Sequence, residues 1–278
     1  MACKKRSSIS AFFALTASVL AAVCLTACSS KQPELPVAEP VPVAVIPVEE
    51  PAPPAEPTLE ERVEALNATA AADTVLFISP APLPAGDRLA RKRETALGDF
   101  LADAERGFLA EHDIQTDFAL LNAELIRSGL PEGPVTKQDI ERTLPFGQTI
   151  VVAEMSGSVL LDLFSEIGTF PQGSGGFAQV SEGVSYTLSF DETGFGTYIT
   201  NVLVDGVPVE AERTYRVALN DFMAEGGNGY SFFLRNDVVK VTSSVSLADA
   251  VADYCAKHAE LLYMNQGERI TIQGGITE

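Results

Sequence analysis

The sequence is poor in histidine and in basic residues. Its 278 residues include two His, no Trp, and 19 Lys plus Arg against 38 Asp plus Glu, for a formal net charge of −19. Proteins that bind nucleic acid need a basic surface to displace counterions from phosphates, so we expect no nucleic-acid partner. A two-metal hydrolase usually takes several His ligands and a catalytic His. His112 and His258 cannot supply that set, and neither lies in a motif.

Cysteine is scarce too, and three of the four cysteines fall within the first 28 residues. Three basic residues at positions 4–6 precede an apolar run from Ile9 to Ala27, which is typical of a secretory signal. The run ends in Leu25-Thr-Ala-Cys28, which resembles the lipobox of bacterial lipoproteins, where the cysteine receives a diacylglyceryl group and the signal is cleaved before it. A transmembrane anchor is the alternative, because the run is nearly long enough. We expect residues 1–27 to be a lipoprotein signal peptide and Cys28 to be lipidated.

Removal of the signal would change both the thiols and the charge of the chain. Cys255 would be the one unmodified cysteine left, so the mature chain is expected to form no internal disulfide. Three basic residues would also leave, which lowers the formal charge from −19 to −22. An anionic membrane repels such a chain, so the lipid must anchor it. We expect an exported protein, lipid-anchored to a bacterial membrane at the periplasmic face or the cell surface.

Proline is concentrated behind the predicted lipidation site. Nine of the 17 prolines lie within residues 31–57. Proline fixes φ and removes a hydrogen-bond donor, so residues 28–57 are expected to form an extended tether of polyproline II type, at about 3 Å per residue. An unstructured tail is the alternative, with nearly the same physical behaviour.

The folded domain is predicted to span residues 58–278. Thr58-Leu-Glu-Glu61 resembles a capping box at the start of a helix. Helices and strands then mix without strict βαβ alternation, which predicts an α+β fold with layered sheets. Predicted helices cover 94–111, 156–166 and 247–262, with a short one from Thr136; predicted strands cover 74–79 (buried), 118–121, 149–155, 184–190, 198–204, 215–219 and 270–272.

A basic cluster stands out in this acidic chain, with four cations at Arg88, Arg91, Lys92 and Arg93. A solvated helix start is one interpretation. Cations at a helix N-terminus oppose the helix macrodipole, however, and a helix N-terminus already attracts anions. The cluster therefore favours an anion-binding site.

Four motifs occur in a fixed order and carry a family resemblance. They are Arg91–Ala104, Asn122-Ala-Glu-Leu-Ile-Arg127, Leu144-Pro-Phe-Gly147 and the Gly-rich segment Asn220–Tyr230. Together they resemble the C-terminal domain of bacterial and animal 5′-nucleotidases, over about residues 72–272. The resemblance implies a layered α/β/β/α fold that binds the nucleotide, next to a metallophosphatase domain that holds two metals and the catalytic His.

The resemblance also implies roles for particular residues. Arg91 and Arg127 would meet the phosphate, because guanidinium groups bind such oxyanions in a bidentate way. Phe146 and Phe222 would sandwich the base, since every nucleobase offers a π-face. Polar contacts would come from Asn122, to the base or ribose edge, and from Asn228, to the ribose hydroxyls.

Two positions depart from the family pattern. Glu124 and Leu125 stand where the family usually has Gly-Gly, and Asn228 stands where it has an Asp. Glu124 would place a carboxylate near the presumed phosphate position, and like charges at close range disfavour each other. Either Glu124 pairs with an arginine when the site is empty, or the ligand carries less negative charge.

No catalytic or metal-ligating residue is predicted. The chain has no Asp-x-His and no Gly-Asn-His-Glu string, and the acidic residues Asp99, Asp103, Asp113 and Asp117 are interpreted as solvated carboxylates. Cys255 lies within a predicted helix, without the context of a nucleophile. Cofactors are expected to be absent from this chain; divalent metals would enter only through a separate metallophosphatase chain.

Three functions stay open at this point. The first is a lipid-anchored domain that binds a nucleoside or nucleotide without hydrolysing it alone. The second is half of a split 5′-nucleotidase, which a mixing assay with the metallophosphatase chain would test. The third is a degenerate domain that serves as a surface adhesin or scaffold; Glu124 and Asn228 favour it, whereas the retained Arg91, Phe146 and Phe222 argue against it.

Overall fold

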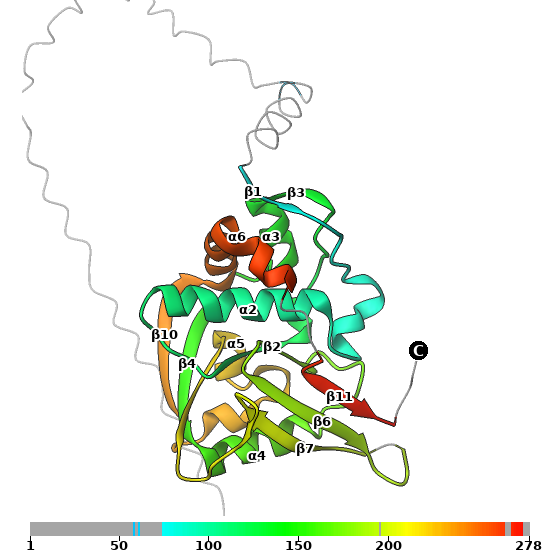
Figure 1. Cartoon of the computed structure of the whole chain (residues 1–278), viewed down its shortest axis with the longest axis vertical. Coiled ribbons are helices and arrows are strands. Elements are labelled where there is room, and N and C mark those ends of the chain that lie inside the picture. The colour runs from blue at the N-terminus through cyan, green and yellow to red at the C-terminus, as the bar shows by residue number, and fades with distance from the viewer. Residues whose placement is uncertain (1–57, 59–60, 62–73, 195, 265–267, 275–278) are drawn as a thin grey trace, which may run out of the picture. The chain divides into compact units, whose positions relative to one another are not determined.

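The computed structural model describes residues 58, 61, 74–194, 196–264 and 268–274 (Figure 1). The predicted signal peptide, lipidation site and tether lie outside these residues. The capping box at the predicted start of the domain is formed: the backbone N–H of Glu61 donates to Thr58 Oγ1 at 3.2 Å, and that of Thr58 donates to Glu61 Oε2 at 2.7 Å. Within the described part of the chain, no helix combines the length and apolar character needed to cross a bilayer.

A five-stranded sheet forms the centre of the domain, in the order β10-β4-β9-β2-β5. Strands β2 and β9 run parallel, and the other neighbouring pairs are antiparallel. Both faces of the sheet are covered, so side chains of successive residues enter two different cores. The bounds are β2 (Phe118–Asn122), β4 (Thr149–Ser156), β5 (Ala178–Val180), β9 (Thr214–Asn220) and β10 (Val239–Ser246).

Helices α2 (Ala96–Glu111), α3 (Lys137–Thr143) and α6 (Leu247–Met264) enclose the first core against one face of this sheet (Figure 1). Thr95 caps α2, because its side chain accepts from the backbone N–H of Gly98 at 3.0 Å. Thr136 and Asp139 form a capping box on α3. The helix predictions at these three places are therefore confirmed.

The second core lies on the opposite face of the central sheet. There α4 (Gly157–Ile167) and a four-stranded sheet, in the order β11-β6-β7-β8, close over it. Phe164 of α4 joins the two sheets, with its ring centroid 6.0 Å from that of Phe118 on β2 and 5.4 Å from that of Tyr186 on β6. The layered α+β fold is thus confirmed. The outer strands are β6 (Val184–Phe190), β7 (Thr197–Val204), β8 (Val207–Pro208) and β11 (Ile270–Gln273).

The prediction that the strand at 74–79 is buried is wrong. Among the described strands, β1 (Val75–Ser79) pairs with β3 (Gly133–Thr136) alone, in a two-stranded ribbon, and Ile78 is 66% exposed. Its apolar run suggested a central strand, but burial depends on what covers it. The sequence analysis missed β3, β5, β8 and β10, since three of them have four residues or fewer and β10 is a largely exposed edge strand.

The interpretation of Asp99 and Asp103 as solvated carboxylates is also wrong. Both are buried on α2, where Arg269 lies beside them: its guanidinium donates to Asp103 at 2.7 and 2.9 Å and lies 3.8 Å from Asp99. Burial raises the pKa of Asp99 to about 8, and Arg269 opposes that rise. The carboxylate of Glu94 accepts from the backbone N–H groups of Arg269 and Ile270, so charged groups fasten β11 to the helix layer.

Glu105 on α2 provides a test of this buried charge. It is fully buried, neither carboxyl oxygen has a hydrogen-bond partner, and burial raises its pKa from 4.5 to about 8. Between these values the unfolded chain ionises while the folded chain stays protonated, so rising pH favours unfolding. Glu105→Gln cannot ionise, so we expect it to lose no stability for this reason as the pH rises. The free energy of unfolding of the variant, relative to that of the wild type, should increase by several kcal/mol from about pH 5 to pH 8. Urea unfolding at both pH values measures this difference, and Glu260→Gln on the exposed surface is the control. The same difference between Glu105→Gln and the wild type at both pH values would contradict a raised pKa of Glu105.

Candidate functional site

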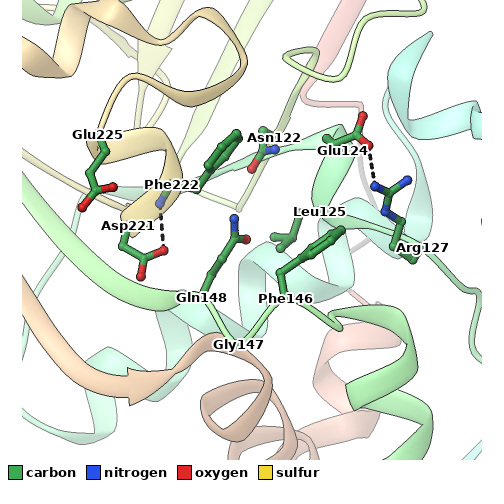
Figure 2. Close-up of a pocket in the computed structure, with 10 residues that line it drawn as sticks. All are labelled: Asn122, Glu124, Leu125, Arg127, Phe146, Gly147, Gln148, Asp221, Phe222 and Glu225. Carbon is green, nitrogen blue, oxygen red and sulfur yellow. Dashed lines mark hydrogen bonds and ion pairs between the residues drawn. The ribbon is translucent and has the colours of Figure 1, made fainter.

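The topology brings three chain segments to one edge of the central sheet. β2 and β9 are parallel, so their last residues, Asn122 and Asn220, lie at the same edge. β4 runs antiparallel to β9, with Ile150 opposite Asn220, so the loop before β4 arrives at this edge as well. A pocket of about 450 Å³ lies there. Its lining (Figure 2) is Asn122, Glu124, Leu125, Arg127, Phe146, Gly147, Gln148, Asp221, Phe222 and Glu225.

Two buried asparagines join the ends of the parallel strands. Asn220 Nδ2 donates to Asn122 Oδ1 at 2.8 Å, while Asn220 Oδ1 accepts from the backbone N–H of Met223 at 3.0 Å. A backbone N–H can only donate, so this second bond fixes which end of the Asn220 amide is which. Asn122 must then present its oxygen to Asn220, which leaves its Nδ2 donor as the group that faces a ligand.

Two aromatic rings border the pocket on different segments. Phe146 precedes β4 and Phe222 belongs to α5 (Asp221–Ala224), and they are 49% and 40% exposed. Figure 2 shows both rings directed toward the pocket. Gly227 accommodates Phe222, because a Cβ at that position would lie 2.4 Å from the ring. Both rings are therefore partly exposed on the border of the same pocket.

The charged end of the pocket is organised around Glu124. This residue lies in the 3₁₀ turn η2 (Ala123–Leu125), directly after β2. Glu124 Oε1 lies 2.6 Å from Arg127, and Glu124 Oε2 forms an ion pair with Arg91. The Arg127 guanidinium also lies over the Phe146 ring, 5.0 Å from its centroid. The charged and aromatic parts of the site are thus in contact.

Asn228 and Arg91 are set back from the pocket surface. Asn228 lies in the Gly-rich turn η3 (Gly227–Gly229) with φ +54°, and its Nδ2 is buried without a partner. A Cβ on Gly175 would lie 3.1 Å from that Nδ2 and 2.6 Å from Glu124 Oε2, so both groups adjoin Gly175. Of the six predicted site residues, Asn122, Arg127, Phe146 and Phe222 line the pocket; Arg91 reaches it through Glu124, and Asn228 lies behind Gly175.

The basic cluster before α2 does not begin the helix. Arg88 and Arg91 belong to the 3₁₀ turn η1 (Gly86–Arg91), and the cap of α2 comes later, at Thr95. Gln179 of β5 holds this segment, because its Nε2 donates to the carbonyl oxygens of Ala90 and Arg93. The turn thereby directs Arg91 toward Glu124.

Sequence reasoning missed three polar residues of the lining. Asp221 accepts from the backbone N–H and the hydroxyl of Thr149, at 3.1 and 2.9 Å, so it fixes the start of β4. Gln148 Oε1 is buried without a hydrogen-bond partner, and Glu225 adds a further carboxylate. Asp221 and Glu225 lie within the Gly-rich motif and were available from it; nothing in the sequence singles out Gln148.

Divalent metals, which the family resemblance implies, do not fit this part of the chain. Among the described residues, no three His, Cys, Asp or Glu side chains are grouped so that they could hold a metal ion. His258 Nε2 instead pairs with Glu111 at 2.6 Å, and His112 Nδ1 lies 2.8 Å from the carbonyl oxygen of Phe108.

Comparison with known proteins establishes the family. The profile described as "5′-nucleotidase, C-terminal domain" matches residues 75–235, and the chain belongs to that family. It is similar to the trifunctional nucleotide phosphoesterase YfkN of Bacillus subtilis, with 33% identity over 151 residues, or 51% of this chain and 10% of the relative. It is also similar to the 5′-nucleotidase of Vibrio cholerae, with 31% identity over 146 residues, or 52% and 24% of the two chains.

Solved structures agree with this assignment. The 5′-nucleotidase precursor of Thermus thermophilus is 27% identical, with a TM-score of 0.65, over 77% of this chain and 42% of the other. The chain thus corresponds to about a tenth to a quarter of the two curated relatives and to less than half of the Thermus protein.

Because the rings of Phe146 and Phe222 are partly exposed, they can be removed with little effect on the stability of the fold. We expect Phe146→Ala and Phe222→Ala each to change the free energy of unfolding by at most about 1 kcal/mol, because exposed side chains contribute little and a cation–π contact adds less than that. Phe233→Ala is the matched control: its ring is fully buried, and its loss should cost about 3–5 kcal/mol. Urea unfolding of the three variants tests this; a pocket variant as unstable as Phe233→Ala would show that the rings hold the fold together.

Proposed function

We propose that this chain is a nucleoside- or nucleotide-binding domain and that the pocket between Phe146 and Phe222 receives the base. The observation that carries the proposal is the pair of exposed rings on two separate segments, directed to one cavity beside amide groups. Stacking on an aromatic ring suits every nucleobase and is worth about 1–3 kcal/mol per base. Asn122 would donate from Nδ2 to the base or ribose edge.

Family membership supports the same ligand class. Two of the curated relatives carry the names 5′-nucleotidase and nucleotide phosphoesterase. In the proposal, this domain contributes recognition of the ligand, and phosphate ester hydrolysis would need a metallophosphatase domain that holds the divalent metals.

Adenosine, AMP and UMP, titrated by calorimetry into the full chain in detergent, test the ligand class. We expect heat of binding for at least one of them and a loss of at least about thirtyfold in affinity for the double variant Phe146→Ala, Phe222→Ala, because two stacking contacts are removed. Tyr198→Ala, on an aromatic residue that is 50% exposed on β7, is the control and should bind as the wild type does. Folded protein that takes up none of the three ligands would contradict the proposal.

We also propose that the chain is exported and anchored to a bacterial membrane through lipid on Cys28, as the lipobox-like string Leu25-Thr-Ala-Cys28 suggests. A single thioether-linked diacylglyceryl group adds two chains, which suffices for stable anchoring. In bacterial cells grown with radiolabelled palmitate, we expect the wild type to incorporate label and Cys28→Ala to incorporate none. Cys255→Ala is the control and should incorporate label as the wild type does, since Cys255 is buried in the helix layer; a wild type without label would contradict the anchor.

A further inference from the structure

The two arginines nearest the pocket are already engaged by a carboxylate of the chain itself. Glu124 uses a different oxygen for each: Oε2 for Arg91 and Oε1 for Arg127. The side chains of Arg91 and Glu124 are 14% and 29% exposed, so this ion-paired group is partly shielded from solvent. Ion pairs gain strength as water is excluded. An anion that approaches these arginines must therefore compete with Glu124 for them and lies close to its carboxylate.

The backbone around Glu124 is arranged to hold its carboxylate in this place. The backbone N–H of Glu124 donates to the carbonyl oxygen of Gly175 at 2.9 Å. Gly175 leaves space for the side chain, because a Cβ there would lie 2.6 Å from Glu124 Oε2 and 3.0 Å from Glu124 Cβ. A side chain at position 175 would require the carboxylate to move, so Gly175 provides a seat for Glu124 between the arginines.

The remaining charge of the pocket lining is negative. Besides Glu124, the lining includes the carboxylates of Asp221 and Glu225, against the single cation Arg127. A phosphate with one to two negative charges would enter a site in which carboxylates outnumber the guanidinium groups. Like charges at close range raise the free energy of the bound state. The electrostatics of the lining therefore disfavour a phosphorylated ligand.

The polar groups left for a ligand are uncharged amides. Gln148 Oε1 lines the pocket as a buried acceptor that has no hydrogen-bond partner among the described residues. Asn122 adds a donor, because its Oδ1 is taken by Asn220. Neutral donors and acceptors next to two aromatic rings complement the edge of a base and the hydroxyls of a ribose.

We infer that the pocket selects an uncharged nucleoside over the corresponding nucleotide and that Glu124 is the residue that determines this selectivity. Its carboxylate occupies the arginines where a phosphate would bind. The inference rests on the proposed function, since it specifies which ligand the same pocket takes.

Calorimetry with adenosine and AMP on the full wild-type chain is the first test, and adenosine should bind at least about tenfold more tightly. Glu124→Gln keeps the shape and removes the charge that holds both arginines. It should raise AMP affinity by about tenfold or more, because hydrogen bonds to charged groups are worth about 1.5–3 kcal/mol. Its adenosine affinity should change by less than about threefold. The gain for AMP should shrink as salt is added, since salt screens charges.

Two further variants distinguish the effect of the Glu124 carboxylate from that of negative charge elsewhere in the pocket. Glu225→Gln removes a carboxylate that lines the same pocket, and its gain for AMP should be well below that of Glu124→Gln. Glu124→Asp keeps the charge and should still favour adenosine, which covers the case in which Glu124→Gln does not fold. Wild type that binds AMP as tightly as adenosine would overturn the selectivity and leave the proposed function intact. Folded wild type and Glu124→Gln that bind neither ligand would overturn the proposed function itself.

Discussion

The hydrogen bond between Asn122 and Asn220 is the contact on which the arrangement of the site depends. It joins the carboxyl ends of the two parallel strands in the middle of the sheet, and both side chains are buried. Everything that lines the pocket leaves the sheet at or beside these two residues: Glu124 follows Asn122, and Phe222 follows Asn220. A buried amide that loses its partner costs about 1–3 kcal/mol, so each asparagine holds the other in place. The constraint positions the start of two loops and orients the Asn122 amide that lines the pocket.

The central sheet can hold these loops because it is covered on both faces. Strands that alternate between two cores cannot shift by one residue without moving every side chain to the wrong core. Charges are also buried in this structure: Arg269 lies among Asp103, Asp99 and Glu94 and fastens the last strand to the helix layer. Such a group is costly to desolvate; the hydrogen bonds between Arg269 and Asp103 offset part of that cost, and burial raises the pKa of Asp99.

The pocket couples charge and stacking through one arginine. Arg127 pairs with Glu124 and lies over the ring of Phe146, so a change at the charged end reaches the aromatic end directly. The backbone of Glu124 is bonded to Gly175, and its two carboxylate oxygens pair with Arg91 and Arg127, so the residue is held at both ends. The pocket thus combines rings, an arginine and amides with an internal carboxylate that pairs with both Arg91 and Arg127.

The sequence by itself determined the helices with strong caps, most of the longer strands, the family and four residues that line the pocket. These follow from local patterns, because capping residues, the alternation of apolar and polar residues in strands, and sequence motifs each lie within a short stretch of the chain. Only the tertiary structure decided that Asp99 and Asp103 are buried, that β1 exposes Val75 and Ile78, and that Gln148 belongs to the site. Burial and charge pairing depend on which distant segments meet, and Glu124 shows it best: its sequence raised two alternatives, and the approach of Arg91, 33 residues earlier in the chain, decided what its carboxylate contacts.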